Sequence, residues 1–255
     1  LSMFFTLVLA NYSWSRGPLC VKLAQNSDKL QTEHDKQIEI LGINNVYGSS
    51  YLLLLLNFSV PIMLVNQPLG IISICILLVQ LLSLYELFDI FKLRDNIIAP
   101  TVFLLLAYQH FFSTGHQATI PSIQWHVGFI TTESITFPFT HLNVILNTFG
   151  PFILVCLAVP LISLWRVPPS SKPITMLAQI VTNLTSVLTY QTVLSVLSFI
   201  FAGHFRRHLM VWKIFAPRYM FSGMTLILIN VLMVFLALWF GTGKLLTQIN
   251  RIFGK

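Results

Sequence analysis

The amino-acid sequence predicts an all-α membrane protein, a bundle of about seven helices that cross a bilayer. Three observations lead to this prediction. Of the 255 residues, 55% are hydrophobic and only 9% are charged, whereas about a quarter of the residues in a soluble domain are charged. The mean hydropathy is +0.78. Several apolar stretches approach the roughly 20 residues that a helix needs to cross a hydrocarbon core of about 30 Å.

The charge and the cysteines exclude two other classes of protein. The formal net charge is +7, but the basic residues are scattered among short loops without aromatic side chains on which bases could stack, so we expect no nucleic-acid partner. Cys75 and Cys156 fall within apolar stretches and Cys20 falls in a polar one. This distribution indicates no disulfide framework.

The N-terminal part is expected to contain a polar loop followed by a helical hairpin. Residues 1–14 resemble the end of a spanning helix, which favours a C-terminal piece of a longer protein over the competing interpretation, a signal peptide. Residues 15–48 carry charges of alternating sign, which is typical of a solvated loop. Residues 51–65, bent or broken at Pro61, and residues 71–91 should form the hairpin.

Four further apolar segments complete the expected bundle. Residues 97–112 should lead into a polar loop, and residues 127–140 are too short and too polar to cross the bilayer. Residues 141–165 are long enough to cross despite two prolines. Residues 174–203 carry hydroxyl and amide side chains that favour packing between helices, and residues 219–243 should form the last span.

The distribution of Lys and Arg predicts the orientation of the chain. With these spans, 11 basic residues lie on one side of the bilayer and 4 on the other. Because the side richer in Lys and Arg is cytosolic, residues 15–48 should form a cytosolic loop. Segments 113–140 and 204–218 should then be lumenal parts of a single transmembrane domain, residues 1–255.

The first candidate site is the loop that follows Phe112. Ser113, Thr114 and Gly115 have the composition of a turn. The side chains that follow can donate and accept hydrogen bonds, and we expect them to bind a sugar or phosphate group, with a purely structural loop as the alternative: His116, Gln117, Gln124 and Trp125. The spacing of the histidines near this loop matches no standard zinc pattern, so no metal site is expected in this chain.

The second candidate site is a basic stretch that alternates with apolar residues. Its members are Arg206, Arg207, His208, Trp212 and Lys213. A helix of this composition should lie in the membrane interface with its charges among phosphate groups. It would either fix the depth of the neighbouring helices or bind lipid phosphate through bidentate guanidinium contacts.

Two motifs carry a family resemblance: Phe111–Trp125, which contains Ser-Thr-Gly-His-Gln, and Arg206–Arg218. They resemble those of glycosylphosphatidylinositol (GPI) ethanolamine phosphate transferases, and most of all those of the members that act on the third mannose. The resemblance covers essentially the whole chain. It implies a multi-pass enzyme of the endoplasmic-reticulum membrane that transfers phosphoethanolamine from phosphatidylethanolamine to a mannose of the GPI-anchor precursor lipid.

The resemblance also implies partners outside this chain. Such enzymes carry an N-terminal, lumenal, alkaline-phosphatase-like domain with two metal ions, expected to be zinc, and a threonine nucleophile, and no part of it is expected in these 255 residues. This chain, without catalytic residues or a cofactor of its own, would bind and present both lipids to that domain. A small multi-spanning stabilising subunit is a further expected partner. A noncatalytic membrane assembly subunit and a lipid transporter remain as alternatives, although we find no internal repeat of the kind that transporters show.

Overall fold

The computed structural model describes residues 21–23, 38–40, 48–93, 97–130, 133–165, 173–243 and 246–247. These residues are almost all helical, as predicted. The exception is an antiparallel ladder within the predicted cytosolic loop, in which β1 (Val21–Leu23) pairs with β2 (Ile38–Ile40). The predicted helix end at residues 1–14 lies outside the described residues.

The predicted hairpin is present as α2 (Gly48–Val65) and α3 (Pro68–Ile90). The expected bend or break at Pro61 is wrong in one respect, because α2 remains a single helix through Pro61. Pro68 opens α3 at a position where the missing N–H costs no helical hydrogen bond. The two helices meet at a turn in which Asn66 Nδ2 donates to the Ile62 carbonyl over 2.8 Å.

α4 (Ile98–Ser113) ends at the first candidate site. Gly115 follows with a φ of +83°, a left-handed conformation that glycine adopts without strain, and its N–H donates to the Phe112 carbonyl. The chain then makes two short 3₁₀ turns, η1 (Ile120–Ser122) and η2 (Trp125–Phe129), before α5 begins. The described part of residues 127–140 therefore contains no spanning helix, in keeping with its predicted shortness.

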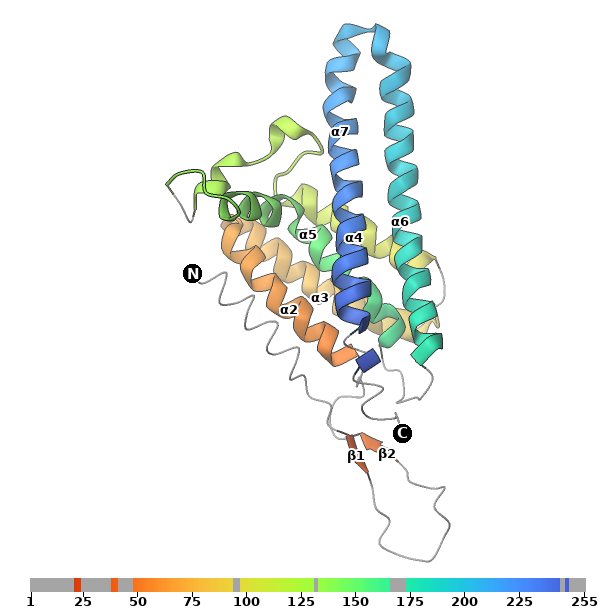
Figure 1. The fold of residues 1–255 in the computed structure, drawn as a ribbon. Helices are drawn as coiled ribbons and strands as arrows, with labels where there is room; N and C mark the ends of the chain where they lie inside the picture. The colour runs from red at the N-terminus through yellow and green to blue at the C-terminus, as the bar shows by residue number, and fades with distance from the viewer. Residues whose placement is uncertain are drawn as a thin grey trace, which may run out of the picture.

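α5 (Phe139–Leu164) is the centre of the bundle, and it contains both Pro151 and Pro160. In an apolar stretch of 18 residues within α5, 94% of the residues are buried. The closest approach is to α2, because a Cβ atom on Gly150 would stand 2.5 Å from Cγ2 of Ile62. Figure 1 shows α2, α3 and α5 running side by side, with the loop after α4 at one end of this group.

The last helices form a long hairpin that projects beyond the others. α6 (Pro173–His204) passes through η3 (Phe205–Arg207) into α7 (Leu209–Val231), which continues as the π-helical segment η4 (Leu232–Thr242). In Figure 1 the turn between α6 and α7 stands well beyond the α2–α5 group. The predicted start of the last helix at residue 219 is wrong, because α7 begins at Leu209 and includes Pro217.

Four helices among the described residues are long and apolar enough to cross a membrane: Pro68–Ile90, Phe139–Leu164, Ile174–Arg207 and Leu209–Phe235. Two shorter apolar helices, Leu54–Val65 and Ile98–Ser113, accompany them. The helical fold therefore fits a membrane protein. The predicted number of about seven spans is not confirmed.

Candidate functional site

His116 is buried and ties the loop after α4 to the central helix. Asn147 Nδ2 on α5 lies 3.3 Å from His116 Nε2, and Thr114 Oγ1 lies 3.0 Å from Nδ1. With the amide as donor, Nε2 accepts and Nδ1–H donates to the threonine oxygen. The ring also stacks on Phe111 with centroids 5.3 Å apart. Burial lowers the pKa of His116 to about 4, so the imidazole is neutral near pH 7.

Two further amide contacts hold the same loop against α5. Asn147 Nδ2 also donates to Gln124 Oε1 over 3.2 Å, and Asn143 Nδ2 donates to the Gly128 carbonyl over 3.4 Å. Trp125 follows Gln124 at the start of η2 and leaves 58% of its surface exposed. The structure therefore places His116 and Gln124 inside the loop's own anchoring network and Trp125 on the surface.

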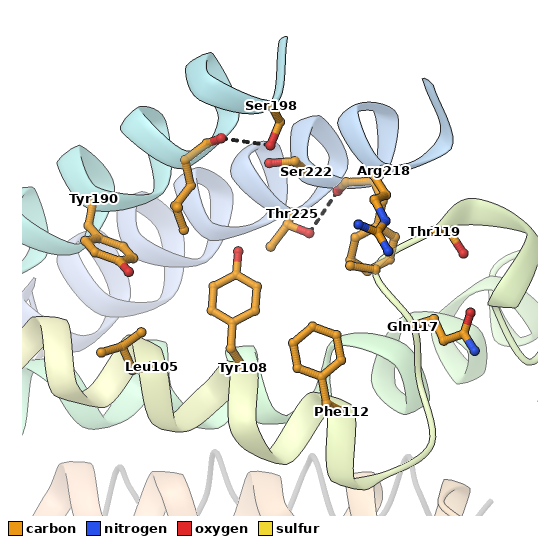
Figure 2. Close-up of a pocket in the computed structure, with 13 residues that line it drawn as sticks. Leu105, Tyr108, Phe112, Gln117, Thr119, Tyr190, Ser198, Arg218, Ser222 and Thr225 are labelled. Carbon is orange, nitrogen blue, oxygen red and sulfur yellow. Dashed lines mark hydrogen bonds between the residues drawn. The ribbon is translucent and has the colours of Figure 1, made fainter. Parts of the chain in front are cut away.

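A pocket of about 530 Å³ lies where α4, α6, α7 and this loop meet. Its apolar wall includes Leu105, Phe112 and Phe221. Its polar wall includes Tyr108, Gln117, Thr119, Ser198, Arg218 and Ser222. Figure 2 shows the Arg218 guanidinium at the loop side of the pocket, where Thr119 and Gln117 also lie. Arg218 is the only charged side chain among the described residues that line it.

Tyr108 crosses the pocket from α4 toward the outer helices. Figure 2 shows its phenol pointing into the space between α4 and α7. The hydroxyl donates to Gln191 Oε1 on α6 over 2.7 Å. Gln191 is fully buried, and its Nε2 atom has no hydrogen-bond partner among the described residues. This bond joins the inner helices to the projecting hairpin through a buried amide, as does a second bond, in which Asn183 Nδ2 of α6 donates to Ser163 Oγ of α5 over 2.7 Å.

The hydroxyl groups of the outer wall direct their protons into the protein. Ser198 Oγ donates to the Leu194 carbonyl and Thr225 Oγ1 donates to the Phe221 carbonyl, both over 2.9 Å. Because each proton is already engaged, each oxygen offers lone pairs to a ligand. The pocket therefore presents hydrogen-bond donors and a positive charge at the loop side and acceptors along α6 and α7.

The second candidate site lies elsewhere. Arg206, Arg207 and His208 are exposed in the turn between α6 and α7, and Trp212 and Lys213 follow in the first turns of α7. Figure 1 places this turn, which we call the hairpin tip (residues 205–213), away from the loop after α4. The nine predicted site residues therefore do not form one site, and of them Gln117 lines the 530 Å³ pocket.

The sequence-based candidates omitted Arg218, Tyr108 and Gln191. A signal for Arg218 exists in the sequence, because residues 218, 221, 222 and 225 follow the spacing that puts four side chains on one face of a helix. All four line the pocket. No comparable signal exists for Tyr108 and Gln191, which are 83 residues apart.

A second buried histidine, His110, has polar neighbours at both ring nitrogens. His110 Nε2 lies 2.6 Å from Gln80 Oε1, and Nδ1 lies 2.8 Å from Ser73 Oγ. Within the part of the chain that the structure describes, no three His, Cys, Asp or Glu side chains come together as a metal site would require. The described residues therefore offer no donor set for the metal ions that the family resemblance implies.

Curated relatives match nearly the whole chain. It is 50% identical over 252 residues to GPI ethanolamine phosphate transferase 3 of Eremothecium gossypii and 48% identical over 252 residues to that of Saccharomyces cerevisiae. Each match covers 98% of this chain and 24% of the relative. The catalytic subunit of GPI ethanolamine phosphate transferase 3 of Homo sapiens is 28% identical over 173 residues, which are 52% of this chain and 16% of that protein.

No family model and no solved structure matches the chain. The relatives therefore carry the assignment, and the chain spans about a quarter of the length of the first two. A match at half identity along 98% of the chain agrees with the two motifs that suggested the family. The chain belongs to the GPI ethanolamine phosphate transferase family, and it corresponds to about a quarter of the length of the transferase 3 proteins that it matches.

Proposed function

We propose that this chain is the membrane portion of a multi-pass enzyme of the endoplasmic reticulum that transfers phosphoethanolamine from phosphatidylethanolamine to a mannose, the third, of the GPI-anchor precursor. The names of the relatives support the reaction. The four helices that could cross a membrane support the placement in a bilayer. In this proposal the loop after α4 and the hairpin tip face the lumen, where the mannose is modified.

The 530 Å³ pocket binds the head group of a phospholipid substrate in this proposal. The observation that carries it is Arg218, a permanent cation at the loop side of a mostly apolar pocket that Gln117 and Thr119 also line. A guanidinium offers five N–H donors in a fixed fork that matches the oxygens of a phosphate. The phosphodiester of the lipid would lie against this group.

The part of the α6–α7 wall that lies farther from the loop fits the rest of a phosphoethanolamine head. An ammonium group donates three hydrogen bonds and accepts none. The oxygens of Ser198 and Thr225, whose protons are engaged with helix carbonyls, provide acceptors at that wall. The apolar side, with Leu105 and Phe221, would meet the glycerol and the start of the chains. The pocket therefore contains a group complementary to each part of the lipid head: a cation, hydrogen-bond acceptors and an apolar surface.

Chemistry at the phosphorus atom would belong to the remainder of the protein. The lumenal domain that the family resemblance implies would supply the two zinc ions and the nucleophile, and these ions would stabilise charge on the transferred group. This chain would hold the donor lipid and the mannosylated acceptor with their heads at the level of the loop. Such positioning lowers the barrier without any reacting group in this chain. A small multi-spanning subunit that stabilises the assembly is part of the proposal.

The test uses the full-length enzyme in a bilayer with both lipids. We expect Arg218→Gln to lower kcat/KM for phosphatidylethanolamine by about tenfold, which is about 1.4 kcal/mol, mainly through KM. Arg218→Lys should restore part of the loss, because it keeps the charge without the bidentate fork. Lys92→Gln, which removes a positive charge at the end of α3, is the control and should leave the kinetics unchanged.

Two results would count against the head-group pocket. Wild-type KM values in Arg218→Gln would show that the lipid phosphate binds elsewhere. An equal loss in Lys92→Gln would show that net charge, and not this pocket, governs lipid capture. Measured transport of lipid without transfer would favour the alternative of a lipid transporter.

A further inference from the structure

A second cavity, of about 440 Å³, lies between the loop after α4, the first turns of α5 and the middle of α7. Its lining is almost entirely apolar. The side chains that define it are Ile123, Trp125, Phe129, Val144, Ile145 and Met224. The polar side chains at its wall are Thr140, His141 and Thr148. No lysine, arginine or acid is among the described residues that line it.

An aromatic wall separates this cavity from the head-group pocket. Phe149 lines the apolar cavity and Phe221 lines the pocket, and their rings stack with centroids 5.5 Å apart and planes 16° apart. Ser222 faces the pocket, whereas Met224, two residues later on α7, faces the cavity. The two spaces are therefore separate sites on opposite sides of one helix.

The surroundings of the cavity indicate what enters it. It lies between α5 and α7, both of which are long and apolar enough to cross a membrane. A water molecule needs two to four polar partners to occupy a buried site, and a wall of carbon offers few. Trp125 and Phe129 are 58% and 46% exposed at the cavity, and such rings favour the edge of a bilayer. A wall of this composition therefore favours contact with lipid over contact with water.

We propose that this cavity holds one acyl chain of a bilayer lipid, selected by its hydrocarbon and not by its head group. The site lacks a cation that could hold a phosphate, which distinguishes it from the pocket at Arg218. An acyl chain bound there would pack against Ile123 and Trp125, which line the cavity. These residues belong to the same short loop as Gln117 and Thr119, so an occupied cavity keeps the loop side of the pocket in place.

The experiment uses the full-length protein in vesicles that contain phosphatidylcholine with a photoreactive diazirine near the end of one chain. After irradiation, we expect crosslinks in the peptides that carry residues 123–129 and 139–149. A phosphatidylethanolamine with the same chains should label these peptides equally. Met224→Trp should reduce the labelling roughly tenfold, the effect of withholding about two methylene groups from the cavity. Met220→Trp, one turn earlier and also exposed, is the matched control and should leave it unchanged.

Each alternative outcome overturns the proposal. Labelling by phosphatidylethanolamine alone would make this a head-group site, and absence of crosslinks in these peptides would mean that no chain enters. Unchanged labelling in Met224→Trp would place the crosslinks outside the cavity. Ile145→Trp, on the α5 side of the wall, repeats the test if Met224→Trp does not fold. Arg218→Gln should not change this labelling. The acyl-chain site and the head-group pocket are therefore tested independently of each other.

Discussion

α5 and α6 are both long, apolar helices, yet they occupy opposite environments. In an apolar stretch of 18 residues, 94% of the residues of α5 are buried, whereas only 17% are buried in the corresponding stretch of α6. Several polar side chains differ in the same way, although Asn183 and Gln191 of α6 are buried. Asn143 and Asn147 of α5 are buried and bond to the loop, whereas Thr182 and Thr185 of α6 are exposed and bond to carbonyls of their own helix. Hydropathy therefore shows which helices can cross a membrane, and neighbours determine which of them form the scaffold.

The head-group pocket lies at the boundary between these two environments. Its inner wall comes from α4 and from the loop that α5 holds, and its outer wall comes from α6 and α7. The inner wall is fixed by close packing and amide contacts. The outer wall belongs to a hairpin that beyond the pocket contacts chiefly itself, for example through Phe205 and Phe215, stacked with centroids 5.3 Å apart. The same kind of substitution should therefore change the free energy of unfolding more on the inner side of this boundary than on the outer side.

The largest expected difference between the two regions concerns buried aromatic rings. Phe111 is fully buried and its ring lies 5.4 to 5.6 Å from those of Phe221 and Phe152. We expect Phe111→Ala to lower the free energy of unfolding by about 3 kcal/mol, because it leaves a cavity where three helices meet. Phe205→Ala at the hairpin tip should cost less than about 1 kcal/mol. Thermal unfolding in one detergent compares the two variants, and equal losses would mean that the hairpin is part of the same cooperative core.

The next difference concerns glycines in α5 and α6. A Cβ atom at Gly150 would collide with Ile62, a buried β-branched side chain with little freedom to move. Gly150→Ala should therefore destabilise the protein by about 2 kcal/mol. Gly203→Ala, in α6, meets nothing within 4 Å and should be neutral or stabilise by about 0.5 kcal/mol. A tolerated Gly150→Ala would show that α2 and α5 are less tightly packed than the structure has them.

The sequence predicted the elements that depend on local composition. The spans at residues 71–91, 141–165 and 174–203 correspond to α3, α5 and α6 within a few residues, because length and hydropathy determine them. The start of α7 was mispredicted because the basic residues before Arg218 were interpreted as a separate surface segment. The hydroxyls of α6, expected between helices, are in part exposed, since each threonine can satisfy its proton on its own backbone.

The candidate site was predictable only where its residues are close in the chain. Gln117 was among the candidates because it belongs to a polar loop, and the turn at Gly115 was expected from the same stretch. The bond between Tyr108 and Gln191 joins distant helices and leaves no local pattern. The separation of Arg207 from Gln117 likewise depends on how far the hairpin projects, which composition does not determine.

A smaller effect is expected at the Tyr108–Gln191 bond, which is one of the bonds that join the two regions. Tyr108→Phe removes the one partner of the buried Gln191 amide among the described residues, and we expect a loss of about 1.5 kcal/mol. Combining it with Gln191→Leu should recover part of that loss, because no buried amide then remains unpaired. Unfolding measurements on the single and double variants form a thermodynamic cycle. Strictly additive losses would show that the two side chains do not interact.

The loop on the inner side should make stability depend on pH. The pKa of His116 is about 4 in the folded protein and 6.5 in the unfolded chain, so between these values the unfolded chain binds the proton more tightly. Stability is therefore complete above pH 6.5 and falls as the pH drops toward 4, by about 1 kcal/mol per unit at most. His116→Gln, which cannot be protonated, should flatten this slope in unfolding measurements from pH 7 to 5. An unchanged slope would assign it to other groups.

The smallest expected effect on stability is at the hairpin tip, where it separates anchoring from substrate capture. Arg206 and Arg207 are exposed. The neighbouring Phe205 ring stacks on Phe215, and this contact does not involve the two arginines. Changing both arginines to Gln should therefore alter the free energy of unfolding by less than about 0.5 kcal/mol. If the tip collects lipids by their phosphate groups before they reach Arg218, the same double variant should raise KM for a lipid substrate by about threefold at unchanged kcat, and added salt should reduce the difference. A wild-type KM at low salt would leave the tip as an anchor that sets the depth of α6 and α7, and lipid capture would then belong to the inner boundary alone.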